Sequence, residues 1–280
     1  MVRTVFVWFC IVVTGAVISI LCILCYPLNP GGRINHRLAG LWGKIAIWAN
    51  RVKVRVEGIK HVPGQGPFVF MSNHQGSYDI FALLGYLPFQ FKWLAKKEIF
   101  SIPILGWAMK ATGYIFIDRE GTRETVKAMN EAAERIHEGM SVVIFPEGSR
   151  SPDGSIQPFK KGGFTLAIKS KVPIVPIAIT GSGGIIPKGK MRVYPGTISI
   201  RIGRPIETKE NTLKDREALM GQVHDIILND FMLMSQEGKE ERVDRQDQNS
   251  RTCLEGAWDY SSTTSPDWRH TSGQLRNRQK

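Results

Sequence analysis

Residues 67–87, PFVFMSNHQGSYDIFALLGYL, form the stretch of sequence that decides the fold. The apolar run 67–73 is typical of a buried strand, and Asp79–Leu87 has the length and apolar content of a helix. His74 lies at the carboxyl end of the predicted strand, where α/β proteins place their ligands. The stretch therefore predicts a strand–loop–helix corner with polar side chains at its turn.

The pair His74 and Asp79 is the candidate for chemistry at this corner. Five residues apart, the two side chains would not share a face of a regular helix. With Ser77 as the helix cap, Asp79 falls in the first turn, and the corner can fold its carboxylate back to the imidazole. Such a pair makes a general base, because the carboxylate fixes the tautomer and the imidazole takes a hydroxyl proton. A purely structural pair is the alternative that this spacing alone leaves open.

Three further segments carry polar or unusual residues at the ends of predicted strands. Residues 113–119, GYIFIDR, finish with Arg119, a candidate bidentate ligand for phosphate. Residues 145–150, FPEGSR, supply four more candidates: Glu147, Gly148, Ser149 and Arg150. Residues 172–178, VPIVPIA, form an apolar strand with prolines at its entry.

Short apolar runs alternate with helical stretches along the middle of the chain. The remaining predicted strands are 113–117, 142–145, 174–180 and 197–202, and the remaining predicted helices are 122–138, 164–170 and 212–234. This alternation predicts an α/β fold with a mixed, mostly parallel sheet flanked by helices.

An uncharged run, Val5–Tyr26, precedes this region. As a helix its 22 residues would extend about 33 Å, enough to cross a hydrocarbon core of about 30 Å. A signal peptide and a buried core helix are the alternatives. Residues 34–49 follow with apolar side chains at helical spacing and basic ones opposite, which predicts an amphipathic helix in the headgroup layer or packed on the core.

Three parts are expected along the chain. Residues 1–50 form a helical membrane anchor, residues 51–235 form the catalytic domain, and residues 236–280 form a polar tail without apolar periodicity. The composition of the tail favours disorder.

The net charge of +12 over 280 residues is concentrated beside the anchor. Residues 31–60 hold seven Lys or Arg side chains against one Glu. An excess at that place favours an anionic membrane surface as partner over nucleic acid. It also predicts location in the cytoplasmic (inner) membrane, with the domain facing the cytoplasm. None of the four cysteines lies between residues 26 and 252, which argues against a cysteine nucleophile or a zinc site there.

Taken in order, the four segments resemble the motifs of the glycerolipid acyltransferase family, and most closely its bacterial-type 1-acyl-sn-glycerol-3-phosphate acyltransferase branch. The similarity extends over residues 60–205 and implies the fold of glycerol-3-phosphate acyltransferases. It implies that His74 is the general base and Asp79 its orienting partner. The remaining roles that it implies concern the acceptor: Arg119 binds its phosphate, Glu147 and Gly148 shape its site, and Ser149 and Arg150 bind phosphate or position the loop.

The resemblance also implies a reaction. An acyl chain passes from acyl-CoA or acyl-carrier protein to the sn-2 hydroxyl of lysophosphatidate, giving phosphatidic acid without an acyl-enzyme, metal or redox cofactor. Two departures concern substrate detail: Gly76 stands where many relatives have Ser, and Ser149 where many have Thr. The alternatives are a family member acting on another lysophospholipid or an amino-acid lipid and, more remotely, a non-catalytic membrane-tethered binding protein.

Overall fold

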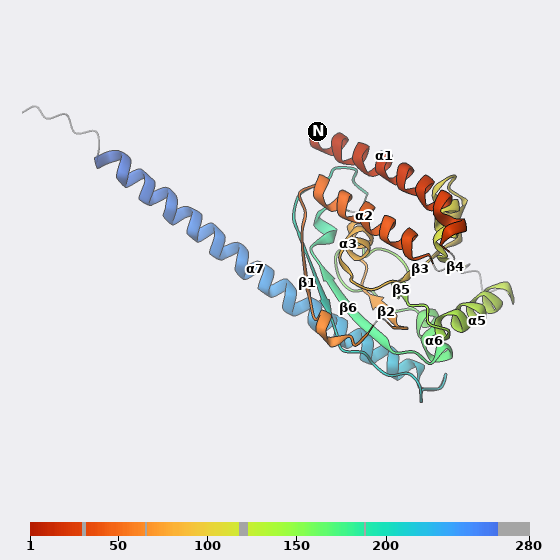
Figure 1. Ribbon diagram of the computed structural model, residues 1–280. Coiled ribbons are helices and arrows are strands. Elements are labelled where there is room, and N and C mark those ends of the chain that lie inside the picture. Colours follow the sequence, from red (N-terminus) through yellow and green to blue (C-terminus); the bar gives the residue numbers. More distant parts are fainter. Residues whose placement is uncertain (30–31, 65, 118–122, 188, 263–280) are drawn as a thin grey trace, which may run out of the picture. The chain divides into compact units, whose positions relative to one another are not determined.

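Seven strands form one sheet in the order β1–β7–β6–β2–β5–β3–β4 (Figure 1). The computed structural model describes residues 1–29, 32–64, 66–117, 123–187 and 189–262. Neighbouring strands are parallel except for β6 and β7, which are antiparallel, so the predicted mixed, mostly parallel sheet is confirmed. The strands are β1 Lys53–Glu57, β2 Val69–Ser72, β3 Lys92–Lys96, β4 Ile115–Ile117, β5 Val142–Ile144, β6 Ile174–Thr180 and β7 Thr197–Ile202.

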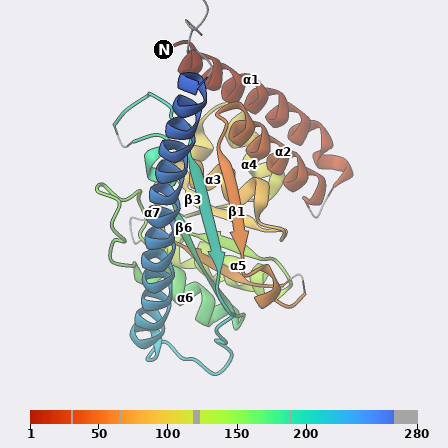
Figure 2. The ribbon, with the colours of Figure 1, turned by 90° about the vertical axis from the view of Figure 1, so that its left-hand side faces the viewer.

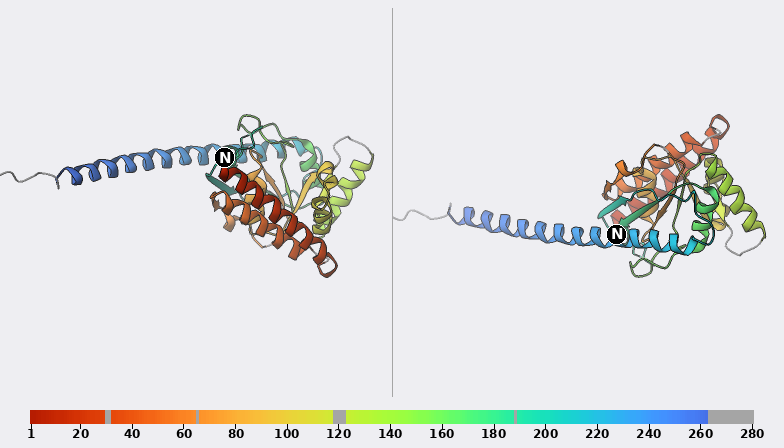
Figure 3. Two further views of the ribbon diagram at one scale, coloured as in Figure 1. Left: turned by 90° about the horizontal axis from the view of Figure 1, so that it is seen from above. Right: turned by 90° about the horizontal axis from the view of Figure 1, so that it is seen from below.

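Helices cover both faces of the sheet because the central strands are apolar on both sides. The helices are α1 Val2–Cys25, α2 Arg33–Ala49, α3 Tyr78–Tyr86, α4 Leu105–Thr112, α5 Arg123–His137, α6 Lys161–Ser170 and α7 Arg216–Ser262. Phe70 and Val143 share a core with α2 and α3, whereas Val69 and Val142 share a second core with α5, α6 and the first turns of α7. Both views in Figure 3 show α2 and α5 on different sides of the strands.

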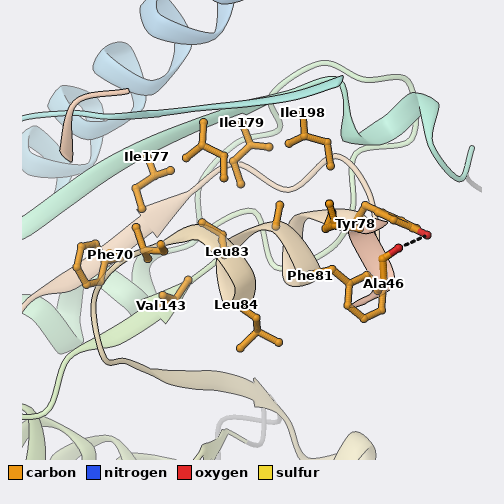
Figure 4. Close-up of a cluster of buried hydrophobic side chains, with 14 of the residues drawn as sticks. Ala46, Phe70, Tyr78, Phe81, Leu83, Leu84, Val143, Ile177, Ile179 and Ile198 are labelled. Carbon is orange, nitrogen blue, oxygen red and sulfur yellow. Dashed lines mark hydrogen bonds between the residues drawn. The ribbon is translucent and has the colours of Figure 1, made fainter. Parts of the chain in front are cut away.

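Helix α3 packs directly on the sheet and is covered in turn by α2. Figure 4 shows Leu83 over the side chains of β2, β5 and β6. Two glycines of α2 allow this close approach: a Cβ at Gly43 would lie 2.6 Å from the Phe81 carbonyl oxygen, and one at Gly40 would lie 2.9 Å from that of Leu84. The corner that holds the predicted site is thus clamped between the sheet and a second helix.

Helix α1 lies alongside α2 (Figure 2). The Trp42 indole N–H of α2 donates a hydrogen bond of 3.0 Å to the Ile11 carbonyl of α1. Only Val7, Ile11, Ser19 and Cys22 of α1 are buried, so most of its apolar side chains face outward. By length and composition, the segment Val2–Leu28 is able to cross a membrane.

Helix α2 packs one part of its surface on the core and leaves other apolar side chains exposed. Ala46 and Ile47 are buried in the core, as expected of a packed helix. Trp48 is 72% exposed, and Ile34 and Leu41 are also exposed, so an apolar surface remains on the outside.

Three elements were not predicted, and one helix is longer than expected. These elements are strands β1 and β3 and helix α4. Helix α7 continues to Ser262 instead of ending near Met234, because the Gln-, Glu-, Lys- and Arg-rich sequence after Met234 still has good helix propensity. The chain divides into two compact units, Met1–Ser235 and Gln236–Lys280.

Candidate active site

The corner after β2 brings His74 and Asp79 into direct contact. The imidazole Nδ1 lies 2.8 Å from Asp79 Oδ2. An ionised carboxylate only accepts hydrogen bonds, so Nδ1 carries the proton and Nε2 is the basic nitrogen. The described residues make no hydrogen bond to Nε2. The His74 side chain is 13% exposed and that of Asp79 is fully buried. A base that is partly accessible to solvent is thus hydrogen-bonded to a buried carboxylate.

Asp79 is fixed by its own turn. Its Oδ2 atom also accepts the backbone N–H groups of Gln75, at 2.8 Å, and Gly76, at 2.9 Å. Three donors on one oxygen offset the cost of burying the carboxylate at the start of α3. The helix begins with Ser77 at its N-cap position, as predicted, but the Ser77 hydroxyl makes no capping hydrogen bond.

An aromatic stack holds the imidazole ring from one side. The rings of His74 and Phe145 are parallel within 12°, with centroids 4.0 Å apart. Trp93 stacks on Phe145 in turn, at 5.5 Å. Phe145 follows β5 and Trp93 belongs to β3, so two neighbouring strands define the orientation of the ring.

Glu147 ties the loop after β5 to the backbone of His74. Its Oε1 accepts the His74 N–H at 2.6 Å, and its Oε2 accepts the Gln157 N–H at 2.9 Å. The Ser151 N–H donates to the His74 carbonyl at 2.8 Å, which fixes the other side of the same residue. Burial raises the pKa of Glu147, and the two N–H donors offset part of that rise. Glu147 therefore holds the backbone of His74 in place, and its predicted part in shaping the acceptor site stays a prediction.

Asn73 and Gly76 bring a third strand to the site. The Asn73 amide donates to the Ile179 carbonyl at 2.9 Å and accepts the Ile179 N–H at 2.7 Å, which joins the end of β2 to β6. A Cβ at Gly76 would lie 2.6 Å from the Ser182 carbonyl oxygen. Glycine stands at position 76, where many relatives have serine, and it allows two loops of this chain to approach each other closely.

The remaining predicted residues lie at the same edge of the sheet or outside the described part. The Arg150 Nη1 group donates a 2.8 Å hydrogen bond to the Ser77 hydroxyl, so its guanidinium lies beside the corner. Ser149 is exposed, and Gly148 has a φ of 78°, a left-handed conformation that suits glycine. Arg119 lies outside the described residues, and its role stays a prediction.

Several residues that shape the site carried no recognisable sequence signal. Asn73, Trp93, Phe145 and Ser151 act through strand neighbours that are distant in the chain. Asn73 and Phe145 stand at the ends of predicted strands, whereas Trp93 belongs to the unpredicted β3 and Ser151 lies in a loop. Within the described ranges, no three His, Cys, Asp or Glu side chains are grouped to hold a metal ion.

The sequence and the fold match known acyltransferases. The family model named Acyltransferase matches residues 53–180. The chloroplastic 1-acyl-sn-glycerol-3-phosphate acyltransferase of Brassica napus is 37% identical over 207 residues, covering 71% of this chain and 60% of that protein. The enzyme of the same name from Limnanthes douglasii is 34% identical over 230 residues, 80% of each chain.

A solved structure agrees with these sequence matches. The 1-acyl-sn-glycerophosphate acyltransferase PlsC from Thermotoga maritima superposes with a TM-score of 0.73 at 26% identity, covering 84% of this chain and 95% of that one. The chain spans 60% and 62% of the length of the chloroplastic relatives from Brassica napus and Arabidopsis thaliana. With 80% of the Limnanthes enzyme matched at 34% identity, the chain belongs to the 1-acyl-sn-glycerol-3-phosphate acyltransferase family.

Proposed function

We propose that this protein transfers an acyl chain from a thioester donor to the sn-2 hydroxyl of 1-acyl-sn-glycerol-3-phosphate, giving phosphatidic acid. The observation that carries the proposal is the contact between His74 Nδ1 and the buried Asp79 carboxylate, which leaves Nε2 as a base. The names of the relatives supply the acceptor class.

In the proposed reaction, Nε2 of His74 takes the proton of the sn-2 hydroxyl as its oxygen attacks the thioester carbonyl. A tetrahedral oxyanion forms, the carbon–sulfur bond breaks, and the new ester remains on the glycerol. The thiolate of CoA or acyl-carrier protein leaves and takes the proton from the imidazolium. Asp79 stabilises the transient positive charge, and a positioned base of this kind contributes about 10²–10⁴ in rate.

Arginine is the residue type suited to holding the acceptor phosphate. Arg150 lies beside Ser77 at the start of α3, close in space to the His74 loop. We assign phosphate binding to Arg150 and, from the resemblance, to Arg119. Glu147 then has a positioning role, because its carboxylate accepts the backbone N–H of His74.

The proposed acceptor is a membrane lipid, and the exposed apolar face of α1 is suited to contact with the membrane that contains it. The outward side chains of α1 support a location of the domain at a membrane, and the basic excess after this helix supports the cytoplasmic side of that membrane.

The test uses the purified full chain in detergent micelles with lysophosphatidate and either acyl-CoA or acyl-carrier protein, with the product read by mass spectrometry. We expect phosphatidate from at least one donor. Incubation with the donor alone should leave the intact protein mass unchanged, because no acyl-enzyme forms. A stable acyl adduct would contradict the mechanism. Turnover of another lysophospholipid without turnover of lysophosphatidate would replace the proposed acceptor.

A further inference from the structure

One cavity in the described part of the chain lies away from the candidate active site. It has a volume of about 1550 Å³. Gly66, Lys92, Tyr114 and Ser141 line it, and they stand at or just before the first residues of β2, β3, β4 and β5. His74 follows the other end of β2. Five residues of extended chain, from Phe68 to Asn73, separate the cavity edge of the sheet from the His74 edge. This length is roughly 17 Å, so the cavity does not hold the reacting atoms.

The cavity is strongly basic. Of the described residues that line it, one is Glu and six are Lys or Arg: Arg33, Arg37, Lys44, Lys92, Lys110 and Arg135. Helix α2 supplies the first three, and β3, α4 and α5 supply one each. Convergence of six cations from four elements is unfavourable unless an anion or solvent screens them.

Lys92 is the most buried of these cations, at 5% exposure. Its Nζ donates a 2.5 Å hydrogen bond to the Thr112 carbonyl. Burial and the neighbouring Arg135 lower the pKa of Lys92 to about 8. Gly32 leaves room for the ammonium group, since a Cβ there would collide with Nζ. The fold thus buries a cation in the wall of this cavity.

Helix electrostatics explain only part of this cluster. Lys110 and Arg135 lie in the last turns of α4 and α5, where cations complement the negative helix end. Arg33 instead lies in the first turn of α2, which holds no acidic residue, and Arg37 follows one turn later. A cation is disfavoured at that positive helix end, so the placement of Arg33 favours a ligand of opposite charge.

Apolar surface borders the basic cavity. Residues 33, 36, 37, 40, 41 and 44 of α2 line it, and Leu41 among them is 48% exposed. Next to these residues, Ile34 and Trp48 of the same helix are 43% and 72% exposed. Tyr26, directly after α1, also lines the cavity. A soluble anion needs no such border, whereas a lipid has acyl chains to cover it.

His36 adds an unused polar atom to the same wall. Its Nε2 lies 3.1 Å from the Phe89 carbonyl oxygen, so Nε2–H is the donor and Nδ1 is an acceptor. Nδ1 is buried and has no hydrogen-bond partner among the described residues. A headgroup hydroxyl is the kind of donor that would satisfy it.

We propose that this cavity binds the phosphate of an anionic phospholipid, at a site separate from the His74 corner. The inference does not depend on the reaction at His74. Its ligand is a lipid of the surrounding leaflet whose phosphate meets Arg33, Arg37 and Lys92 while its chains lie beside α1 and α2.

The test measures phosphatidylglycerol bound to the full chain by native mass spectrometry from detergent. This lipid has no free sn-2 hydroxyl and is neither substrate nor product of the proposed reaction. We expect one saturable lipid per chain, at least tenfold weaker binding of phosphatidylcholine, and no competition by millimolar inorganic phosphate. The double variant Arg33→Gln/Arg37→Gln should weaken phosphatidylglycerol binding at least tenfold, as should Lys92→Gln.

A matched variant, Lys190→Gln/Lys209→Gln, removes the same charge from exposed positions outside the cavity. It should keep phosphatidylglycerol binding within twofold. Circular dichroism checks that each variant is folded, and the exposed arginine pair keeps the test valid if the Lys92 variant unfolds. An equal loss of phosphatidylglycerol binding in the matched variant would show that the effect comes from the net charge of the chain and not from this cavity. That result would overturn the proposal. Inorganic phosphate that displaces the lipid would assign the cavity to a soluble anion instead.

Discussion

Replacement of Glu147 by Gln separates a positioning role from acceptor binding. The two carboxylate oxygens accept one backbone N–H each, from His74 at 2.6 Å and Gln157 at 2.9 Å. Glu147 is 4% exposed, so water does not replace a lost acceptor. In the variant the amide keeps one oxygen, and its NH₂ group faces the other N–H donor.

The size of the effect follows from that mismatch. One charge-assisted hydrogen bond is worth about 1.5–3 kcal/mol, and the neutral amide is cheaper to bury, so the net loss of stability is about 2 kcal/mol. For a unit of this size, that loss lowers Tm by about 4–8 °C. Displacement of the His74 backbone by a fraction of an ångström to 1 Å lowers kcat by about 10–100-fold.

The assay combines thermal unfolding followed by tryptophan fluorescence with initial rates at varied lysophosphatidate. We expect Tm and kcat to fall together while KM for lysophosphatidate changes less than threefold. Glu210→Gln is the control, because it removes the same charge from an exposed position. A tenfold rise in KM with unchanged Tm and kcat would refute the positioning role and return Glu147 to the acceptor site.

Three more predictions address other parts of the chain. Arg150→Ala should raise KM for lysophosphatidate about tenfold or more and leave the donor KM within threefold. If Ser77→Ala reproduces this loss, Arg150 acts by holding the corner and not by binding phosphate. Because the pKa of Lys92 is about 8 in the fold against its usual 10.5, the unfolded chain binds more protons between these values, and stability should rise with pH across that window by up to roughly 3 kcal/mol. Urea unfolding should show that rise in the wild type but not in Lys92→Gln, and an equal rise in both would assign it to other groups. Removal of residues 236–280 should leave kcat within twofold, since His74, Asp79 and Glu147 all belong to the unit Met1–Ser235, and a loss above tenfold would give the second unit a part in turnover.

The elements with strong local signals were predictable. The β2–α3 corner combines an apolar run, a cap residue and a helical stretch, and the structure has it within two residues of the predicted bounds. Strand β1, KVRVE, was missed because charged residues alternate with valines along a partly exposed edge strand. Strand β3 was missed because lysines stand at both of its ends.

The site was predictable only where its residues are close in sequence. The His74–Asp79 contact depends on a local turn, which the sequence indicates. The Glu147 contact with His74 and the Phe145 stack depend on β5 lying next to β2, and strand order cannot be inferred from residue spacing. The basic cavity could not be predicted from the sequence for the same reason, since its cations are spread from Arg33 to Arg135.

The role of His74 as the base is tested most directly by the single-turnover rate of phosphatidate formation in His74→Ala, with folding checked by its Tm. We predict a rate at least 10²-fold below that of the wild type, in a protein whose Tm falls through loss of the Asp79 hydrogen bond and the Phe145 stack but stays above the assay temperature. A folded His74→Ala protein that forms phosphatidate within threefold of the wild-type rate would contradict the mechanism.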